Sequence, residues 1–355
     1  MVLVSRKASS NQISTERSSS HKGERRSGDI LSELKKDDRF SKISRVLEKS
    51  GSLRDSLGQN ELTFFAPTDL AMKKFLEIVK GSTNNEKEIN MEQIVTYHIV
   101  NEEIGLSDMY SGQLLESDYV SKSLGKKDSK QKIHVLQVLG SFVLNGFVRV
   151  EQSGFHAQNG VVHPVDLVLV PPVQLTEQLF QLPYVCSTFI SAVQACDLVD
   201  DMSEKGLTCF VPTNAAFKRM NLTDLIYLFS PLGRKDLTKV IQYHIGKDLL
   251  YAQDMIEEEG KQIEVPTMFK KEKIVIEVNS REKKGGRGGS RKGNKGKDKL
   301  PQDYYYVLNN GEALIDMVLC DYIVENGTSH FIDRVLIPDS VINNLPSRKF
   351  VHEDM

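Results

Sequence analysis

The stretch NGVVHPVDLVLVPP, residues 159–172, has a second copy in the same chain, NGTSHFIDRVLIPD, residues 326–339. Seven of the fourteen positions are identical in fixed register: Asn, Gly, His, Asp, Val, Leu and Pro. Two catalytic sites, two metal sites or two copies of a structural element would each produce such a pair. The choice among them depends on what else recurs along the chain.

Two other landmarks recur in the same order. Residues 62–75, LTFFAPTDLAMKKF, match residues 207–220, LTCFVPTNAAFKRM, at seven of fourteen positions, and a Tyr-His pair occupies positions 97–98 and 243–244. A long internal period of this kind is the signature of a repeated folding unit. The chain is therefore predicted to be a tandem duplication.

The spacing of the landmarks supports the duplication and locates one insertion. Pro67 and His98 are 31 residues apart, and Pro212 and His244 are 32 residues apart. From the Tyr-His pair to the motif histidine the distance is 65 residues in the first copy and 86 in the second. The excess falls on the basic, Gly-rich residues 281–299, which are expected to form a flexible loop in place of a tight turn.

Composition indicates a globular protein of two domains. The chain has 355 residues, of which 39% are hydrophobic and 26% charged. We predict a disordered basic Ser-rich arm at 1–27, a first domain at 28–173, a second at 174–340 with the basic loop at 280–302, and a tail at 341–355. The arm lacks the apolar core of a secretory signal, and no apolar run is long enough for a membrane-spanning helix.

Each copy predicts the same order of elements. A helical segment opens the copy, at 30–51 and 175–198, and Gly51 is the expected end of the first. Next comes a short strand that ends at proline, and then a helix capped by threonine. A further helix ends at the Tyr-His pair, and several strands follow it. In the second copy KIVIEV and YYYVLNN flank the basic loop like the arms of a hairpin. The strand-end and cap residues are Pro67, Thr68, Pro212 and Thr213.

These landmarks resemble the fasciclin-like domain family. The first copy carries TFFAPTDLAM, YHIV and NGVVHPVDLVLVPP, and the second carries CFVPTNAAF, QYHIGKDLL and NGTSHFIDRVLIP, so the likeness covers about residues 28–340. The resemblance implies an α+β fold: two tandem fasciclin-like domains, each a wedge or sandwich of short β-strands covered by several helices. It also implies a non-enzymatic cell-adhesion or protein-interaction module of the periostin type.

The resemblance further implies a glycoprotein of the extracellular matrix, cell surface or endomembrane lumen with a protein partner there, although no signal peptide is visible. A second hypothesis is an intracellular or organellar binder of a polyanion, or of a small apolar ligand in a groove between the domains. No Gly-rich phosphate loop, nucleophile elbow, H-E-x-x-H or carboxylate pair is present, so no catalytic residue, cofactor or metal is assigned.

The repeated Asn-Gly, His and Asp residues are predicted to be structural. A metal site needs at least three converging ligands, whereas a His and an Asp three apart on a strand point to opposite faces of a sheet. The Asn-Gly pair is expected to supply the positive φ of a tight turn, and the His and Asp to anchor the turn and the final strand by hydrogen bonds. The residues are Asn159, Gly160, His163, Asp166, Asn326, Gly327, His330 and Asp333.

Partner contacts are implied by position in the family. In animal relatives the region around the Tyr-His pair is implicated in integrin recognition, and a buried histidine bonded to the backbone is the alternative for this pair. The segment before the second Asn-Gly turn lies where some members carry an Asp-Ile adhesion motif, which a tyrosine interrupts here. The contact candidates are Tyr97, His98, Tyr243, His244, Asp321, Tyr322 and Ile323.

The basic loop is a candidate for binding acidic glycans or anionic lipid. Residues 281–299 carry nine Lys/Arg and two acids, a net charge of +7, in a chain of net charge -2. The loop has no aromatic residue for base stacking, so nucleic acid is not the expected partner, and a solvated loop is the alternative reading. The candidates are Arg281, Lys283, Lys284, Arg287, Arg291 and Lys292.

Modification of the chain is predicted at few positions. The cysteines Cys186, Cys196, Cys209 and Cys320 match no metal-binding spacing and are expected to be free buried thiols, with a disulfide between the first two, or another pairing, as the alternative. Of the two Asn-x-Thr triplets, Asn221 is the better glycan acceptor, since it is expected to follow a helix and precede a polar turn.

Overall fold

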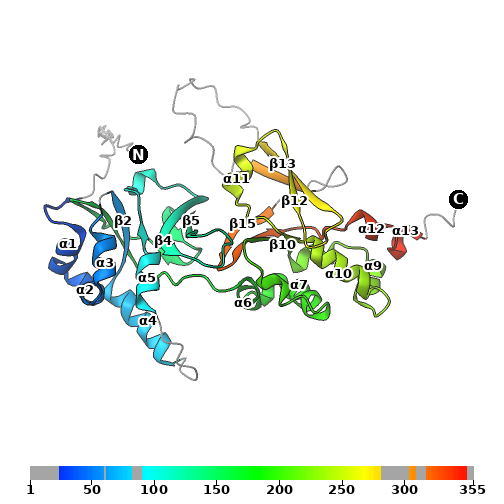
Figure 1. Ribbon diagram of the computed structural model, residues 1–355, viewed down its shortest axis with the longest axis horizontal. Helices are drawn as coiled ribbons and strands as arrows, with labels where there is room; N and C mark the ends of the chain where they lie inside the picture. The colour runs from blue at the N-terminus through cyan, green and yellow to red at the C-terminus, as the bar shows by residue number, and fades with distance from the viewer. Residues whose placement is uncertain (1–23, 60, 82–89, 281–303, 309–316, 350–355) are drawn as a thin grey trace, which may run out of the picture.

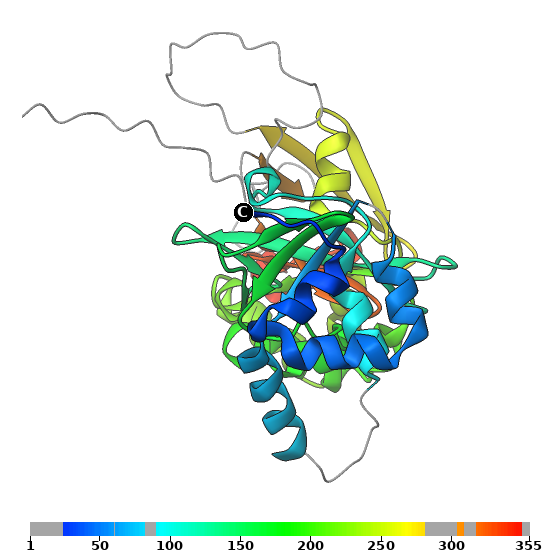
Figure 2. The same ribbon diagram turned by 90° about the vertical axis from the view of Figure 1, so that its left-hand side faces the viewer.

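The two copies form two domains that lie side by side along the long axis of the molecule (Figure 1). Figure 2 turns the first domain toward the viewer and shows its helices gathered on one side of its strands. The computed structural model describes residues 24–59, 61–81, 90–280, 304–308 and 317–349.

Domain 1 is built on one nine-stranded sheet. Its centre is the parallel pair β2 (Leu62–Pro67) and β9 (Gly160–Val165), both buried along their whole length. Strands covered on both faces have near-continuous apolar sequences, as LTFFA and GVV have. On the side of β9 the sheet continues with β8 (Phe155–Ala157) and then β1 (Glu24–Arg25). On the side of β2 it continues, in order, with β3 (Ile99–Val100), β4 (Gln113–Val120), β5 (Lys130–Val138), β6 (Ser141–Leu144) and β7 (Val148–Arg149).

The helices of domain 1 differ from the prediction at its opening segment. The expected single helix breaks twice, at Asp37 and at Ser50, both of which have extended backbones and cap the next element with their side chains. Helix α2 thus ends at Lys49, within two residues of the predicted end at Gly51, but Gly51 also begins a further helix that was not predicted. The helical elements are α1 (Ile30–Lys36), η1 (Asp38–Phe40), α2 (Ser41–Lys49), α3 (Gly51–Leu57), α4 (Asp69–Gly81), α5 (Met91–Tyr97) and η2 (Leu106–Asp108).

Domain 2 repeats the central strand pair and carries a second sheet. Strands β10 (Leu207–Pro212) and β16 (Gly327–Ile332) pair in parallel, with the same register as in domain 1. They are flanked by β11 (Ile245–Gly246) and β15 (Met317–Val324), and the second sheet is formed by β12 (Gln262–Pro266), β13 (Lys273–Ser280) and β14 (Tyr304–Leu308). The antiparallel pairing of β13 with β14 confirms the predicted hairpin arms.

Most helices of domain 2 lie below β10 and β15 in Figure 1, on the side opposite the second sheet, whereas α11 packs against the second sheet. The predicted opening helix is again divided, because Pro183 starts a new helix after Leu182. The helical elements are α6 (Leu175–Phe180), α7 (Pro183–Ala195), η3 (Asp201–Ser203), α8 (Asn214–Lys218), α9 (Leu222–Phe229), α10 (Arg234–Tyr243), α11 (Ala252–Glu257), α12 (Asp339–Ile342) and α13 (Pro346–Lys349).

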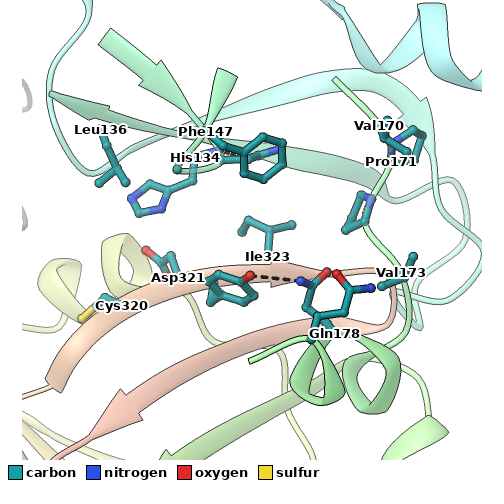
Figure 3. Close-up of a pocket in the computed structure, with 15 residues that line it drawn as sticks. His134, Leu136, Phe147, Val170, Pro171, Val173, Gln178, Cys320, Asp321 and Ile323 are labelled. Carbon is teal, nitrogen blue, oxygen red and sulfur yellow. Dashed lines mark hydrogen bonds between the residues drawn. The ribbon is translucent and has the colours of Figure 1, made fainter. Parts of the chain in front are cut away.

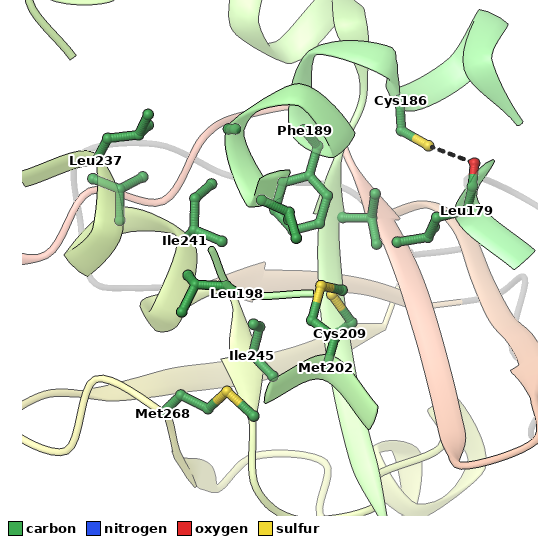
Figure 4. Packing of buried hydrophobic residues seen from close by; sticks show 14 of the residues in the cluster. Leu179, Cys186, Phe189, Leu198, Met202, Cys209, Leu237, Ile241, Ile245 and Met268 are labelled. Atoms are coloured by element: carbon green, nitrogen blue, oxygen red, sulfur yellow. Dashed lines mark hydrogen bonds between the residues drawn. The ribbon is translucent and has the colours of Figure 1, made fainter. Parts of the chain in front are cut away.

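Each central strand separates two hydrophobic clusters. Successive side chains of a strand point to opposite faces, so Phe64 packs in one cluster of domain 1 and Phe65 in the other. Cys209 and Phe210 divide in the same way in domain 2. Figure 4 shows Cys209 packed against Met202 in the first of these clusters.

The cysteine prediction is confirmed in part. None of the four cysteines, all of which lie in the described part of the chain, is joined in a disulfide. Cys186 and Cys209 are buried as predicted, whereas Cys196 and Cys320 are only partly buried. Burial raises the pKa of the Cys186 thiol to about 11, so this thiol stays protonated at neutral pH.

The domains are joined by buried hydrogen bonds as well as by the chain. Gln131 on β5 is fully buried, and its Nε2 donates to the carbonyl of Val324 at 3.0 Å. Ser123 Oγ donates to Glu325 Oε1 at 3.1 Å, and the backbone N–H of Gly206 donates to the Ser123 carbonyl at 3.1 Å. The loop after β4 and the turn before β16 therefore hold the two domains in one orientation.

Candidate functional site

Asn159 connects the final strand of domain 1 to its first helices. Its Oδ1 accepts the backbone N–H of Ile30 at 2.9 Å, and its Nδ2 donates to the carbonyls of Leu57 at 2.7 Å and Gln59 at 3.0 Å. The side chain is 8% exposed, so water cannot readily replace these bonds. One amide side chain thus bonds the first backbone N–H of α1 and two backbone carbonyls at and just after the end of α3.

Asn326 makes the equivalent three bonds in domain 2. Its Oδ1 accepts the N–H of Leu175 at 3.0 Å, and its Nδ2 donates to the carbonyls of Met202 at 2.9 Å and Glu204 at 2.8 Å. The Asn326 side chain thus accepts a hydrogen bond from the first residue of α6 and donates hydrogen bonds to two carbonyls of the segment before β10. The repeated asparagine is required by these bonds and not by the turn conformation alone.

The glycine after each asparagine is required by space. The backbone of Gly160 has φ of +154°, but Gly327 is not among the residues with positive φ, so the predicted positive-φ role is wrong for the second copy. A Cβ on Gly160 would lie 2.1 Å from the carbonyl oxygen of Leu62, and one on Gly327 would lie 1.9 Å from that of Leu207. Close approach of the parallel partner strand excludes any side chain in both domains.

The motif histidines are buried and bonded to the backbone. His163 Nε2 lies 2.7 Å from the carbonyl oxygen of Ile104, and His330 Nε2 lies 2.9 Å from that of Leu250, so in each ring Nε2 carries the proton. Burial lowers the pKa of both histidines to about 4, because it disfavours the charged form. Both rings are therefore neutral donors at neutral pH.

The motif aspartates lie beyond the strand ends and have different partners. Asp166 Oδ1 accepts the N–H of Arg149 at 2.8 Å and so holds β7. Asp333 pairs with the guanidinium of Arg219, just after α8. The strand ends at residue 165 or 332, so the expected placement of His and Asp on opposite faces of one strand does not apply.

The Tyr-His pairs are buried, which contradicts their expected role in partner contact. His98 and His244 are 0% exposed, Tyr97 is 0% exposed and Tyr243 is 5% exposed. In each histidine Nδ1–H donates within its own helix end, to the carbonyl of residue 94 or 240, and Nε2 accepts a backbone N–H from residue 169 or 336. Each pair ties its helix to the segment that follows the final strand.

The tyrosine hydroxyls reach the neighbouring sheet. Tyr97 donates to the carbonyl of Lys132 at 2.8 Å, and Tyr243 donates to that of Lys273 at 3.0 Å.

The prolines end β2 and β10 as predicted, and Thr213 Oγ1 caps α8 by accepting from Ala216 N at 3.2 Å. Thr68 Oγ1 similarly accepts from residue 71 at 3.3 Å.

Two buried threonines of the same network were missed by the sequence analysis. Thr63 Oγ1 donates to the carbonyl of Glu102 at 2.6 Å and accepts from the N–H of Ile104 at 2.8 Å. Thr208 makes the same pair of bonds with residues 248 and 250, at 2.7 and 2.8 Å. The available signal was the repeated Leu-Thr that opens both strands.

The segment Asp321–Tyr322–Ile323 lies on β15 and lines a pocket between the domains (Figure 3). Asp321 and Ile323 are 2% and 8% exposed, and Tyr322 is half-buried with its hydroxyl accepting from Gln178 Nε2 at 3.0 Å. The two more deeply buried members cannot contact a macromolecular partner, which contradicts the expectation for them. They can contact a small molecule inside the pocket.

The glycan candidates occupy opposite environments. Asn221 is exposed and caps α9 by accepting from Thr223 N at 2.9 Å, so it precedes a helix and not the polar turn that was expected. Asn326 is 0% exposed, and its Nδ2, the atom that a glycan would occupy, already donates two hydrogen bonds. Only Asn221 can accept a glycan in the folded chain.

The remaining predictions concern charge, metals and membranes. The six basic candidates between 281 and 292 lie outside the described residues. Within the described ranges, no group of three or more His, Cys, Asp or Glu side chains is placed to hold a metal ion. No helix in this described part combines the length and apolarity needed to cross a bilayer.

The shared register, buried hydrogen bonds and strand order of the two domains define a tandem-repeat α+β protein. The fasciclin domain model matches residues 38–171 and 185–338. The chain therefore belongs to the fasciclin domain family, as its sequence resemblance implied.

Curated relatives of the chain occur in animals and fungi. The chain is 26% identical over 296 residues to transforming growth factor-beta-induced protein ig-h3 of Oryctolagus cuniculus, covering 82% of this chain and 37% of that protein. It is 23% identical over 294 residues to human periostin, covering 82% and 30%, and 25% identical over 224 residues to a fasciclin-like arabinogalactan protein of Arthroderma benhamiae, covering 61% and 48%. The chain thus spans about a third to a half of the length of these relatives.

A solved structure also matches. It is the FAS1 domain pair from the insect cell adhesion molecule fasciclin I, with 18% sequence identity and a TM-score of 0.42, covering 85% of this chain and 98% of the other.

Proposed function

We propose that the chain is a non-enzymatic adhesion or protein-interaction module that recognises its partner through the surfaces of two fasciclin domains. The observation that carries this proposal is the family match in both halves of the chain. Relatives of the chain include ig-h3 and periostin, and the fasciclin resemblance implies a role in cell adhesion. The motif histidines are occupied by backbone hydrogen bonds, which supports a structural role for them.

The arrangement of the domains suits recognition of a repetitive partner. The hydrogen bonds of Gln131 and Ser123 to the second domain fix the distance between equivalent surfaces. Two linked copies of a weak site raise the effective concentration of the second after the first has bound. Because the Tyr-His pairs are buried, we place the contact surface elsewhere on the two domains.

Attachment of cells to the immobilised full chain tests this function. We expect more cells to remain on the coated surface than on an albumin coat, and we expect the double variant Tyr97→Phe, Tyr243→Phe to retain them because both hydroxyls point inward. Attachment no better than on albumin would refute the adhesion role. Loss of attachment in a correctly folded double variant would restore the Tyr-His pairs as contacts.

The family resemblance supports a secreted, cell-surface or endomembrane location. If the chain enters the secretory pathway, the exposed Asn221 should carry an N-glycan and the buried Asn326 should not. The measurement is the mass of the natural product before and after glycosidase treatment, with Thr223→Ala as the matched loss of the acceptor. Glycan-free protein found in the cytosol would contradict this location and favour an intracellular binder.

The basic segment 281–299 supports a second contact, with acidic glycans or anionic lipid. Its net charge of +7 should give salt-sensitive retention on immobilised heparin and on vesicles that contain phosphatidylserine. Replacing its six candidate residues by Gln should lower the salt concentration of elution. The same number of Gln replacements in the arm at 1–27 is the control, and equal effects of the two sets would remove the segment's special role.

A further inference from the structure

The pocket between the domains is formed by both copies and the connection between them. It encloses about 340 Å³, within the usual size range of small-molecule sites. Strand β5 and the turn before β7 supply one wall, residues 170–173 a second, and β15 with the end of α6 a third (Figure 3). Most of the lining is apolar and includes Leu136, Phe147, Val170 and Ile323.

His134 brings an imidazole into this lining without a hydrogen-bond partner. The residue is 8% exposed, and no hydrogen bond to its ring is found among the described residues. Its backbone is held on both sides, since its N–H donates to Asn145 Oδ1 at 2.9 Å and its carbonyl accepts the N–H of Asn145 at 2.8 Å. Burial lowers its pKa to about 4, so the ring is a neutral donor and acceptor.

Asp321 faces the same pocket from the other domain. Its Oδ1 accepts the N–H of Ala252 at 2.9 Å, while Oδ2 has no hydrogen bond within the described part of the chain. The left-handed backbone of Asp321, with φ of +52°, belongs to an irregularity in the pairing of β15 with β16. Such bulges re-aim side chains and are common at functional sites.

The His134 ring and Asp321 Oδ2 lack protein partners but are not among the fully buried unpaired atoms, so each faces the pocket, where water or a ligand can bond to it. Here they lie on opposite walls of one apolar pocket, the arrangement expected of groups that orient a ligand. No lysine or arginine is present among the described residues that line it, so a carboxylate or phosphate would find no counter-charge beside Asp321. A hydroxyl group can donate to the carboxyl and accept from the imidazole.

We propose that this pocket binds a small uncharged apolar molecule that carries a hydroxyl group, a phenol or an alcohol, with the hydroxyl between His134 and Asp321 and the apolar body against Phe147, Val170 and Ile323. The proposal does not depend on the adhesion role. It assigns to the interface between the domains a ligand that would bind only when the two domains are docked.

Binding of 2-naphthol to the full chain, followed by its fluorescence, tests the site, with naphthalene and 2-naphthoate as comparison probes. We expect saturable binding of one 2-naphthol per chain. Naphthalene should bind about tenfold more weakly, because it leaves both buried polar groups unpaired, and 2-naphthoate should bind more weakly still. No saturable binding, or binding of 2-naphthoate as tight as that of 2-naphthol, would overturn the proposal.

Variants locate the bound probe. Val170→Trp adds bulk to a partly exposed lining position and should abolish binding, whereas Leu139→Ala, in the fully exposed turn between β5 and β6 and outside the lining, should leave it unchanged. His134→Phe keeps a ring in place but removes its nitrogens, so the preference for 2-naphthol over naphthalene should fall to the part that the bond to Asp321 supplies. Unchanged affinity in folded Val170→Trp places the probe elsewhere and refutes the site, even if His134→Phe fails to fold.

Discussion

The motif histidines of the two domains, His163 and His330, make the same hydrogen bond through Nε2 but differ at Nδ1. In both, Nε2 donates to a carbonyl of the loop before the next strand. His330 Nδ1 accepts the backbone N–H of Asp321 at 3.2 Å, whereas His163 Nδ1 is buried with no hydrogen-bond partner among the described residues. The residue of domain 1 that corresponds to Asp321, six before the turn glycine, is Gly154.

The difference separates what the duplication preserved from what it changed. A Cβ on Gly154 would lie 2.7 Å from the carbonyl oxygen of Val162, so domain 1 leaves no room for a side chain there. In domain 2 the irregular β15 makes room for a carboxyl group beside domain 1. The bonds that close each domain are the same in both, and the position that faces the partner domain has diverged.

The largest expected effect comes from the turn glycines. Gly160→Ala and Gly327→Ala should each destabilise their own domain by about 3 kcal/mol or more, since the new Cβ would overlap a backbone oxygen of the parallel strand. Thermal unfolding followed by circular dichroism measures the loss, and hydrogen exchange assigns it to a domain.

Gly81→Ala is the matched control for this comparison, because a Cβ there meets no atom within 4 Å and φ is not positive. It should change stability by less than about 1 kcal/mol. If Gly327→Ala were as mild as this control while Gly160→Ala were severe, backbone conformation and not close approach would be the reason for the glycines.

The next effect concerns the asparagines. Asn159→Ala and Asn326→Ala each remove three buried hydrogen bonds and leave one N–H and two carbonyls unpaired, so each should cost about 2–3 kcal/mol. Equal losses in the two domains would support a common role. Chemical denaturation gives the values, and Asn101→Ala, which removes an exposed side-chain bond to Asp118, should have little effect.

Asp321 should make the stability of domain 2 depend on pH in a way that domain 1 does not share. Burial raises the pKa of Asp321 from 3.8 to about 7. Because the unfolded carboxyl ionises first, stability falls as pH rises from about 4 to 7, and the neutral variant Asp321→Asn escapes this loss. At pH 8 the variant should be more stable than the parent by on the order of 1–2 kcal/mol.

The variant must be compared with the parent at each pH, because the buried histidines change the stability of the protein with pH in the direction opposite to Asp321. Their pKa values are lowered to about 4, so their contribution to stability is lost as pH falls from 6.5 toward 4. Asp55→Asn, at an exposed helical position, is the matched control for the loss of one carboxyl group. A variant that tracks the parent at every pH would show that Asp321 ionises normally.

Much of this fold could be predicted from the sequence because the period is strong. The recurring segments LTFF and NGVVH, with their counterparts, are the central parallel strands, and their identical register follows from their identical pattern. The helix break at Asp37 was missed, since it depends on an extended backbone and a cap that the periodicity of apolar residues does not encode.

The candidate site was predicted less well. Repetition indicated that the Tyr-His pairs matter, but it does not show which way a helix end faces, and both pairs point into the core. The pocket joins His134 to Asp321, far apart in the chain, through the docking of two domains. No local pattern carries that information.

The smallest predicted effects come from the motif aspartates, which share a sequence position but not a partner. Asp166→Ala removes a bond to a backbone N–H and should cost about 1 kcal/mol at any salt concentration. Asp333→Ala removes an ion pair whose side chains are 27% and 48% exposed, so it should cost about 0.5 kcal/mol and less in 1 M salt. If both losses proved equally sensitive to salt, the aspartates would act alike through charge. Their presence in both copies would then reflect one electrostatic role, and not a backbone hydrogen bond in one domain and an ion pair in the other.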